Sequence, residues 1–132
     1  MRILHRMNTK NILVVDDSPT MRRMIVASLG ELKGVAFSEA GTGLEAIEQL
    51  AISTTSLMIV DLNMPEMNGM EVLSFVRKHQ AYRSMPIIVL TTRADDGIRS
   101  AALAAGASAY LTKPFLPRVL AARVSDLLSL EQ

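Results

Sequence analysis

The chain alternates short apolar runs with longer segments in which apolar residues recur at helical spacing. The runs 11–15, 56–60 and 87–90 consist almost entirely of aliphatic residues, many of them β-branched. Unbroken apolar runs of this length are typical of strands that are buried on both faces. Weaker runs at 35–39 and 108–111 predict two further strands. The pattern therefore predicts five short strands.

The segments between these runs predict helices. Ser18 followed by Pro19 is a typical helix start, because serine caps a helix and proline suits its first position. This helix is expected to close at Gly30 or Gly34, and further helices are predicted after residue 43, over 70–80, over 95–105 and over 116–130. Five strands alternating with five helices predict a doubly wound, flavodoxin-like (βα)5 domain of the α/β class. Its five-stranded parallel sheet has helices on both faces.

Composition excludes several classes of protein. The 132 residues carry 14 Lys and Arg against 13 Asp and Glu, and this net charge of +1 argues against a nucleic-acid binder that works through a basic surface. Cysteine is absent, which excludes disulfides, thiolate metal sites and cysteine nucleophiles. No apolar run is long enough to span a membrane, and residues 1–10 lack the apolar core of a signal peptide. We expect a cytoplasmic protein without direct nucleic-acid binding or membrane contact.

Polar residues stand at the carboxyl ends of the predicted strands. Asp16 and Asp17 follow the first strand, Asp61 the third, Thr91 the fourth and Lys113 the fifth. Because ligands of open parallel sheets bind outside these ends, we expect the five side chains to meet at one edge. Three carboxylates in one pocket repel one another unless a cation holds them, and an all-oxygen ligand set favours Mg²⁺, with Mn²⁺ as a substitute. Together with a hydroxyl and an ammonium, the set suits phosphoryl transfer to an aspartate.

Each of these residues also has an ordinary structural interpretation. Asp16 or Asp17 alone can cap the first helix, and Tyr110 fits a half-buried strand tyrosine with a hydrated hydroxyl. Arg22 and Arg23 fit the solvated face of the first helix. The coincidence of so many polar residues at one sheet edge favours the functional interpretation of the acids.

Four motifs, in this order and at this spacing, resemble the receiver domain of bacterial two-component response regulators. They are Val14-Val15-Asp16-Asp17-Ser18, Asp61-Leu62-Asn63-Met64-Pro65 with Gly69, Thr91-Thr92, and Tyr110-Leu111-Thr112-Lys113-Pro114-Phe115. The similarity extends from residue 11 to about residue 128, and such a set is highly specific. On this resemblance, residues 1–10 form an N-terminal tail and residues 11–130 a receiver domain, with no output domain in this chain.

The resemblance implies that Asp61 is the phosphoacceptor. It would take its phosphoryl group from a sensor histidine kinase or a phosphotransfer protein. The domain would catalyse only its own phosphorylation and dephosphorylation. Mg²⁺ would be held by Asp17, Asp61 and the main-chain carbonyl of Asn63, with Asp16 helping through water.

The resemblance also assigns roles around the phosphoryl group. Lys113 would hold the group together with Thr91 and Thr92, and the bond from Lys113 to Pro114 would be cis. Thr91 and Tyr110 would form the switch, in which Thr91 moves towards the phosphate and Tyr110 turns inward.

Within the family, the opening Asp16-Asp17-Ser18-Pro19-Thr20-Met21-Arg22-Arg23 resembles stand-alone, chemotaxis-type receivers. The segment 120–124 is instead similar to the last helix of receivers fused to winged-helix DNA-binding domains. Those receivers dimerise through charge pairs across the fourth helix, fifth strand and fifth helix. Here Arg123 is present, but Ala109 and Val119 stand where its acidic partners are expected. We therefore expect a monomer that binds a different downstream protein on this surface.

Three other interpretations remain open from the sequence. The segment 41–46 fits G-x-G-x-x-A between a strand and a helix, which is the dinucleotide-binding pattern of oxidoreductases. A haloacid-dehalogenase-like phosphohydrolase also forms an aspartyl phosphate on a parallel sheet, although its motif requires acids at alternate positions. A receiver excised from a longer regulator, with a DNA-binding or enzymatic output domain, is the third alternative.

Overall fold

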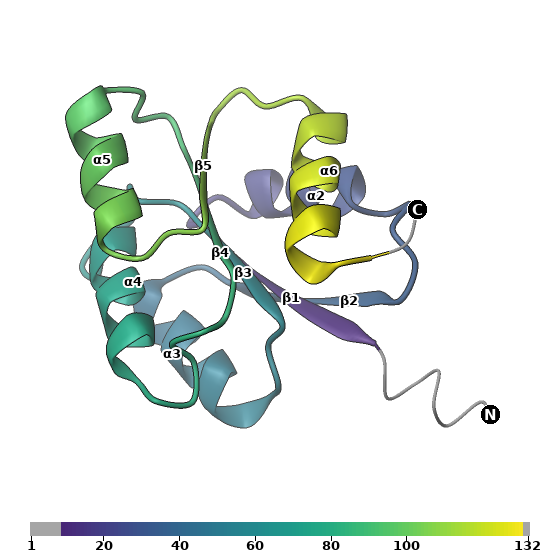
Figure 1. The fold of residues 1–132 in the computed structure, drawn as a ribbon, viewed down its shortest axis with the longest axis horizontal. Helices are drawn as coiled ribbons and strands as arrows, with labels where there is room; N and C mark the ends of the chain where they lie inside the picture. The colour runs from purple at the N-terminus through teal and green to yellow at the C-terminus, as the bar shows by residue number, and fades with distance from the viewer. Residues whose placement is uncertain (1–8, 131–132) are drawn as a thin grey trace.

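Five parallel strands form one sheet in the order β2-β1-β3-β4-β5, in a computed structural model that describes residues 9–130 (Figure 1). The strands are β1 (Lys10–Val15), β2 (Val35–Ala40), β3 (Leu57–Val60), β4 (Ile87–Thr91) and β5 (Ala109–Thr112). After β1 the chain first adds β2 on one side and then returns to add β3 on the other. The carboxyl ends of β1 and β3 therefore flank the point where the strand order reverses, which is where open parallel sheets bind ligands.

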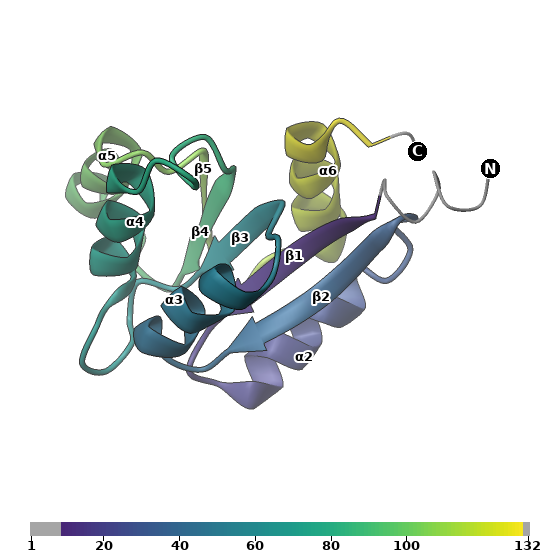
Figure 2. The same cartoon turned by 90° about the horizontal axis from the view of Figure 1, so that it is seen from below.

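Helices cover both faces of the sheet, as the sequence predicted (Figures 1 and 2). One face is packed by α2 (Pro19–Ser28) and α6 (Pro117–Leu128). The other is packed by α3 (Gly43–Ile52), α4 (Gly69–Lys78) and α5 (Asp96–Ala104). No described helix is long and apolar enough to cross a membrane. The predicted α/β class and the flavodoxin-like, doubly wound arrangement are confirmed.

Strand β1 is central in the sheet and is apolar at successive positions because both of its faces are buried. Side chains alternate between the two faces of a strand, so Ile12 and Val14 join the core under α2 and α6. Leu13 and Val15 join the core under α3, α4 and α5. All four are at most 1% exposed. Since both faces are covered, neither set of positions can be polar.

The start of the first helix is as predicted, and its end is not. The hydroxyl of Ser18 accepts a hydrogen bond from the Met21 amide, and Pro19 occupies the first turn of α2. The helix ends at Ser28, earlier than either predicted glycine, and Gly34 instead makes a turn before β2 with φ at 73°. The Gly34 carbonyl accepts a hydrogen bond from the Lys10 amide, so β1 begins at Lys10.

The predicted ends of two other segments were also displaced. The last helix begins after Leu116, which has extended backbone, and stops at Ser129, whose φ of 55° is left-handed. Strand β5 lies one residue later than predicted. Most of the predicted N-terminal tail, residues 1–8, lies outside the described residues.

Candidate functional site

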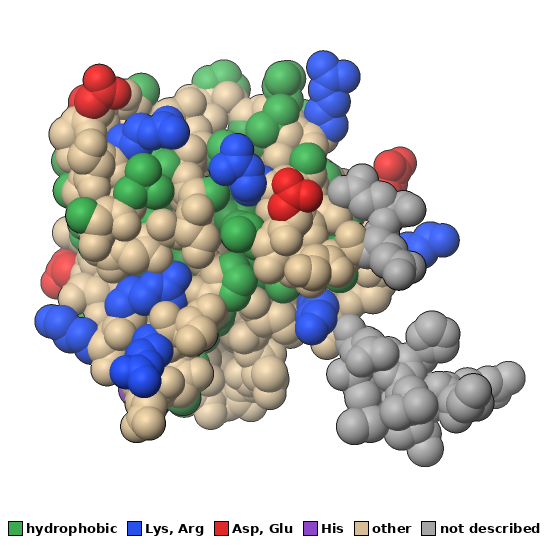
Figure 3. Space-filling view, viewed as in Figure 1, with side chains coloured by type: hydrophobic (Ala, Val, Ile, Leu, Met, Phe, Trp, Pro, Cys, Tyr) green, Lys and Arg blue, Asp and Glu red, His purple; other side chains and the backbone are tan. Residues whose placement is uncertain are grey.

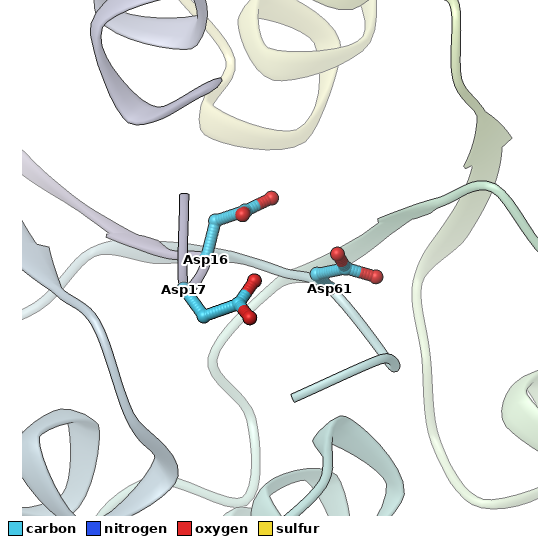
Figure 4. A group of neighbouring side chains, drawn as sticks. All are labelled: Asp16, Asp17 and Asp61. Atoms are coloured by element: carbon cyan, nitrogen blue, oxygen red, sulfur yellow. The ribbon is translucent and has the colours of Figure 1, made fainter. Parts of the chain in front are cut away.

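Asp16, Asp17 and Asp61 form one acidic cluster at the sheet edge (Figure 4). One carboxylate oxygen from each lies within 4.8 Å of the others. The sheet causes this proximity, because Val15 is in register with Val60 and the residues that follow these two strands leave the sheet side by side. Asp16 and Asp61 are buried, at 2% and 6% exposure, whereas Asp17 is exposed. The cluster predicted from the strand ends is confirmed.

Lys113 joins the cluster from the end of β5. Its Nζ donates to Oδ2 of Asp16 over 2.6 Å and to Oδ2 of Asp61 over 2.9 Å. Burial of the ammonium lowers its pKa, but the hydrogen bonds and charges of the two carboxylates outweigh this effect, and the net pKa lies above the ordinary value of 10.5. Lys113 is therefore a cation at neutral pH, and its bond to Pro114 is cis, as expected.

Main-chain amides fix the two buried carboxylates from the other side. Oδ1 of Asp16 accepts from the Ser18 amide over 2.9 Å, and Oδ1 of Asp61 accepts from the Asn63 amide over 3.0 Å. Each buried acid thus has one oxygen on an amide and the other on Lys113. Within residues 9–130, the carboxylate of Asp17 makes no side-chain hydrogen bond.

Gly69 allows the loop after Asp61 to pack tightly. It begins α4, and a Cβ at this position would overlap the main-chain carbonyl of Asp61 and lie 2.8 Å from Cα of Leu62. Asn68 caps the same helix by accepting from the Glu71 amide, while the Glu71 carboxylate accepts from the Asn68 amide. Asn68 and Glu71 therefore form a complete capping box beside the acidic cluster.

The cluster suits a divalent cation. Three carboxylates face one ammonium, so the local charge is negative, and all side-chain donors are oxygen atoms. Oxygen ligands with a surplus of negative charge are the environment that Mg²⁺ and Mn²⁺ prefer. Asp17 is the acid most accessible to solvent and has no competing hydrogen bond in the described part of the chain. The residues present therefore fit a bound metal ion.

Thr91, Thr92 and Tyr110 lie next to this edge. Thr91 is fully buried, and its Oγ1 accepts from the Arg93 amide over 3.4 Å. Thr92 is exposed, and its Oγ1 accepts from Nδ2 of Asn63 over 3.2 Å, which links the loop after β3 to the end of β4.

The structural interpretation of Tyr110 was wrong. This side chain is only 4% exposed, and its hydroxyl donates to the Arg93 carbonyl over 2.6 Å. Burial, followed by the nearby Asp95 carboxylate, raises the pKa of the phenol above 10.0. The Arg99 guanidinium lies 5.9 Å from the ring centroid. The ring is thus buried, with its hydroxyl bonded to the main chain of Arg93.

Sequence reasoning missed Arg22 and the main chain of Arg93. The sequence pattern places Arg22 on a solvated face, but its side chain is only 18% exposed, and its guanidinium donates to the Asp16 carbonyl and to the Glu39 carboxylate. Arg23 is exposed, as predicted. Arg93 contributes only its amide and carbonyl to Thr91 and Tyr110. No residue-type signal identifies a partner that acts through its backbone.

The glycine pattern at 41–46 does not form a phosphate cradle. Glu45 accepts from the Gly41 amide over 2.8 Å, and Thr42 caps α3. A Cβ on Gly43 would lie 2.7 Å from Cγ of Met67, so the loop after β3 covers this turn. The segment also follows the edge strand β2, whereas the dinucleotide-binding fold uses its central first strand. The oxidoreductase interpretation therefore fails.

Comparisons with known proteins agree with this geometry. Residues 12–125 match the response regulator receiver domain family. The chain is 43% identical over 118 residues to a chemotaxis protein CheY homolog of Campylobacter jejuni, covering 89% of this chain and 91% of that protein. It is 44% identical over 110 residues to the chemotaxis protein CheY1 of Helicobacter pylori, covering 83% and 89%.

A solved structure supports the same assignment. The chemotaxis protein CheY4 of Vibrio cholerae superimposes with a TM-score of 0.83 and 32% identity, covering 90% of this chain and 98% of that one. The sequence motifs, the sheet topology and the acidic edge agree with this similarity. The chain belongs to the response regulator receiver domain family, and within it to the CheY-type receivers of phosphorelay signalling.

Proposed function

We propose that Asp61 accepts a phosphoryl group from the phosphohistidine of a sensor histidine kinase or phosphotransfer protein. A carboxylate oxygen of Asp61 bonds to phosphorus, and the phosphorus–nitrogen bond breaks with its electron pair remaining on the imidazole. The observation that carries this proposal is the position of Asp61 between two further acids and the Lys113 ammonium at the strand switch point. The protein acts on no other substrate and catalyses only the gain and loss of its own phosphoryl group.

The metal in this proposal is Mg²⁺, with Mn²⁺ as a substitute. Asp17, Asp61 and the main-chain carbonyl of Asn63 would hold it, and Asp16 would contribute through water. When bound, the ion supplies charge neutralisation for the phosphoryl oxygens. Lys113, Thr91 and Thr92 complete the binding of the phosphoryl group. Lys113 already contacts Asp61, and Thr92 is joined to the Asp61 loop through Asn63.

Thr91 and Tyr110 form the proposed switch. Thr91 accepts from the amide of Arg93, and Tyr110 donates to the carbonyl of the same residue. A movement of Thr91 towards a phosphoryl group on Asp61 would therefore act on the segment that holds Tyr110. A phosphoryl group brings about 1.5–2 negative charges, enough to recruit a nearby hydroxyl donor.

The downstream protein is proposed to bind the surface formed by α5, β5 and α6. Figure 3 shows hydrophobic side chains exposed over these helices, with basic side chains beside them. Leu103 of α5 is 41% exposed and Val119 of α6 is 40% exposed. The net charge of +1 argues against nucleic-acid binding, and the protein is proposed to work in the cytoplasm without membrane binding. Because Arg123 lacks acidic partners at positions 109 and 119, it is proposed to work as a monomer. Light scattering with and without the phosphoryl mimic beryllofluoride tests this, and a stable dimer formed with the mimic would contradict it.

The test of function is labelling by acetyl phosphate. We expect base-labile phosphorylation of the wild type in Mg²⁺, and none in EDTA. Asp61→Asn keeps the side-chain size but removes the nucleophile, so labelling should be lost. Asp126→Asn, at an exposed acid of α6, is the matched control and should label as the wild type does. Undiminished labelling of Asp61→Asn would mean that another residue is the acceptor.

A further inference from the structure

Arg22 connects the acidic loop to the edge of the sheet. From the first turns of α2 its side chain reaches back, and NH1 donates to the main-chain carbonyl of Asp16 over 2.6 Å. Its Nε donates to Oε1 of Glu39 over 2.8 Å. Glu39 stands on β2, in register with Val14. One guanidinium thus ties the helix, the end of β1 and the neighbouring strand together.

The carbonyl that Arg22 holds belongs to the peptide that joins Asp16 to Asp17. The peptide unit is planar, so fixing its oxygen fixes the direction in which the chain enters Asp17. On either side, the Asp16 amide donates to the Ala40 carbonyl over 3.1 Å, and the Ser18 amide donates to Oδ1 of Asp16 over 2.9 Å. The backbone is therefore held both before and after Asp17.

Asp17 depends on this backbone for its orientation. Its carboxylate is exposed and, among residues 9–130, makes no side-chain hydrogen bond, whereas Asp16 and Asp61 are each fixed by an amide and by Lys113. Its carboxylate nevertheless lies within 4.8 Å of theirs. The direction of the Asp17 side chain is consequently set by the peptide that Arg22 holds.

We propose that Arg22 is a positioning residue for Asp17, and that Glu39 is its counter-ion. This inference rests on the proposed function, because it assigns Asp17 to a Mg²⁺ site. Arg22 uses two different nitrogens of a rigid planar group, a geometry that a lysine cannot reproduce. Glu39 neutralises the guanidinium, so that a cation placed next to the Asp16 carbonyl does not oppose a divalent ion.

The neighbouring arginine provides a matched control. Arg23 carries the same charge on the same helix, but it is exposed, and within residues 9–130 its side chain bonds only to Oγ1 of Thr20 on its own helix. Arg23→Ala should therefore bind Mg²⁺ as the wild type does. Arg22→Ala should weaken Mg²⁺ binding by about tenfold, the lower end of the usual loss when an outer-shell partner of a metal site is removed. Arg22→Lys should not restore it.

A substitution at Glu39 separates the positioning effect of Arg22 from the effect of its positive charge. Glu39→Gln keeps an acceptor oxygen for Nε of Arg22 but leaves the guanidinium unpaired. We expect a smaller loss of Mg²⁺ affinity than in Arg22→Ala, and this loss should shrink at high salt because exposed charges are screened. The loss in Arg22→Ala should persist at high salt, since it arises from a displaced ligand.

The experiment is calorimetric titration of each variant with MgCl₂, at a temperature where circular dichroism shows all of them folded. A second readout is the Mg²⁺ concentration that gives half-maximal labelling by acetyl phosphate, which should rise in Arg22→Ala by the same factor as the dissociation constant. Equal affinities of Arg22→Ala and the wild type, full rescue by Arg22→Lys, or an equal loss in Arg23→Ala would each overturn the inference. If Arg22→Ala does not fold, the Mg²⁺ affinities of Arg22→Lys and Glu39→Gln test the inference in its place, and wild-type affinity in both would overturn it. A wild type that binds no Mg²⁺ would instead overturn the proposed metal site, and the inference with it.

Discussion

Replacing Lys113 with methionine removes the ammonium that separates the carboxylates of Asp16 and Asp61. Methionine retains most of the aliphatic stem, so the change isolates the charge and its two hydrogen bonds. The Lys113 side chain is 9% exposed, and both partners are buried. Without the ammonium, two buried carboxylates and the nearby Asp17 face one another, and no other cationic side chain of residues 9–130 pairs with these carboxylates.

The expected loss of stability follows from these contacts. A hydrogen bond to a charged group contributes about 1.5–3 kcal/mol, and removing one partner of a buried ion pair typically costs about 3–5 kcal/mol. Asp17 is open to solvent, which allows water to reach the cluster, so we expect a loss of about 3 kcal/mol in the absence of metal. For domains with total stabilities of about 5–15 kcal/mol this is a large fraction. Mg²⁺ should recover more stability in Lys113→Met than in the wild type, because it no longer competes with an ammonium.

Urea unfolding followed by circular dichroism, in EDTA and in millimolar Mg²⁺, measures both effects. The matched control is Lys33→Ala, at an exposed lysine between α2 and β2, which should change stability by less than about 0.5 kcal/mol. Equal stability of Lys113→Met and the wild type in EDTA would show that the ammonium does not stabilise the buried carboxylates. A smaller response of the variant to Mg²⁺ would show that the ammonium does not compete with the metal ion.

Three further changes have outcomes that the same contacts determine. The pKa of Lys113 is raised on folding above its ordinary value of 10.5, so its contribution to stability is complete below that value and disappears as the pH rises through the folded pKa. The free energies of unfolding of the wild type and Lys113→Met should therefore converge at high pH, and a difference that stays constant would contradict this. Tyr110→Phe should lower the free energy of unfolding by about 1 kcal/mol, because it removes the hydrogen bond to the Arg93 carbonyl. In a pH titration followed by ultraviolet absorbance, the variant should lack a tyrosine whose pKa lies above 10.0, and loss of a tyrosine with a pKa below 10.0 would contradict this. Gly69→Ala should destabilise the fold by about 1–3 kcal/mol and slow the labelling of Asp61, because the added Cβ meets the main chain of residues 61 and 62. Gly97→Ala is the control and should have neither effect, since the space around Gly97 is open. Equal stability and labelling of the two variants would show that the close approach at Gly69 is unimportant.

Some of this architecture is predictable because it depends on residue type at fixed positions. The apolar runs of β1, β3 and β4 are buried on both faces, so their composition alone identifies them as central strands. The acids and Lys113 follow strand ends, and a parallel sheet brings all such ends to one edge. The edge strand β2 is only partly buried, which explains its weaker pattern.

Other features were not predictable, because they depend on main-chain atoms that folding brings together. Arg22 has the spacing of a solvated helix residue, but the Asp16 carbonyl and Glu39 lie within its reach. The Tyr110 hydroxyl has its partner in the Arg93 carbonyl, and any residue type at that position presents the same atom. Helix ends were similarly hard to predict, since Ser129 ends α6 in a left-handed conformation that serine rarely adopts.

In the proposed function, Asp61 carries the phosphoryl group. The most direct measurement is reduction of the acetyl phosphate-treated protein with borohydride, which converts an aspartyl phosphate to homoserine, followed by peptide mapping by mass spectrometry. We predict homoserine at position 61, dependent on Mg²⁺, and none at positions 16 or 17. Homoserine at position 16 or 17, or at no position in a protein that has taken up phosphate, would show that Asp61 is not the phosphoacceptor.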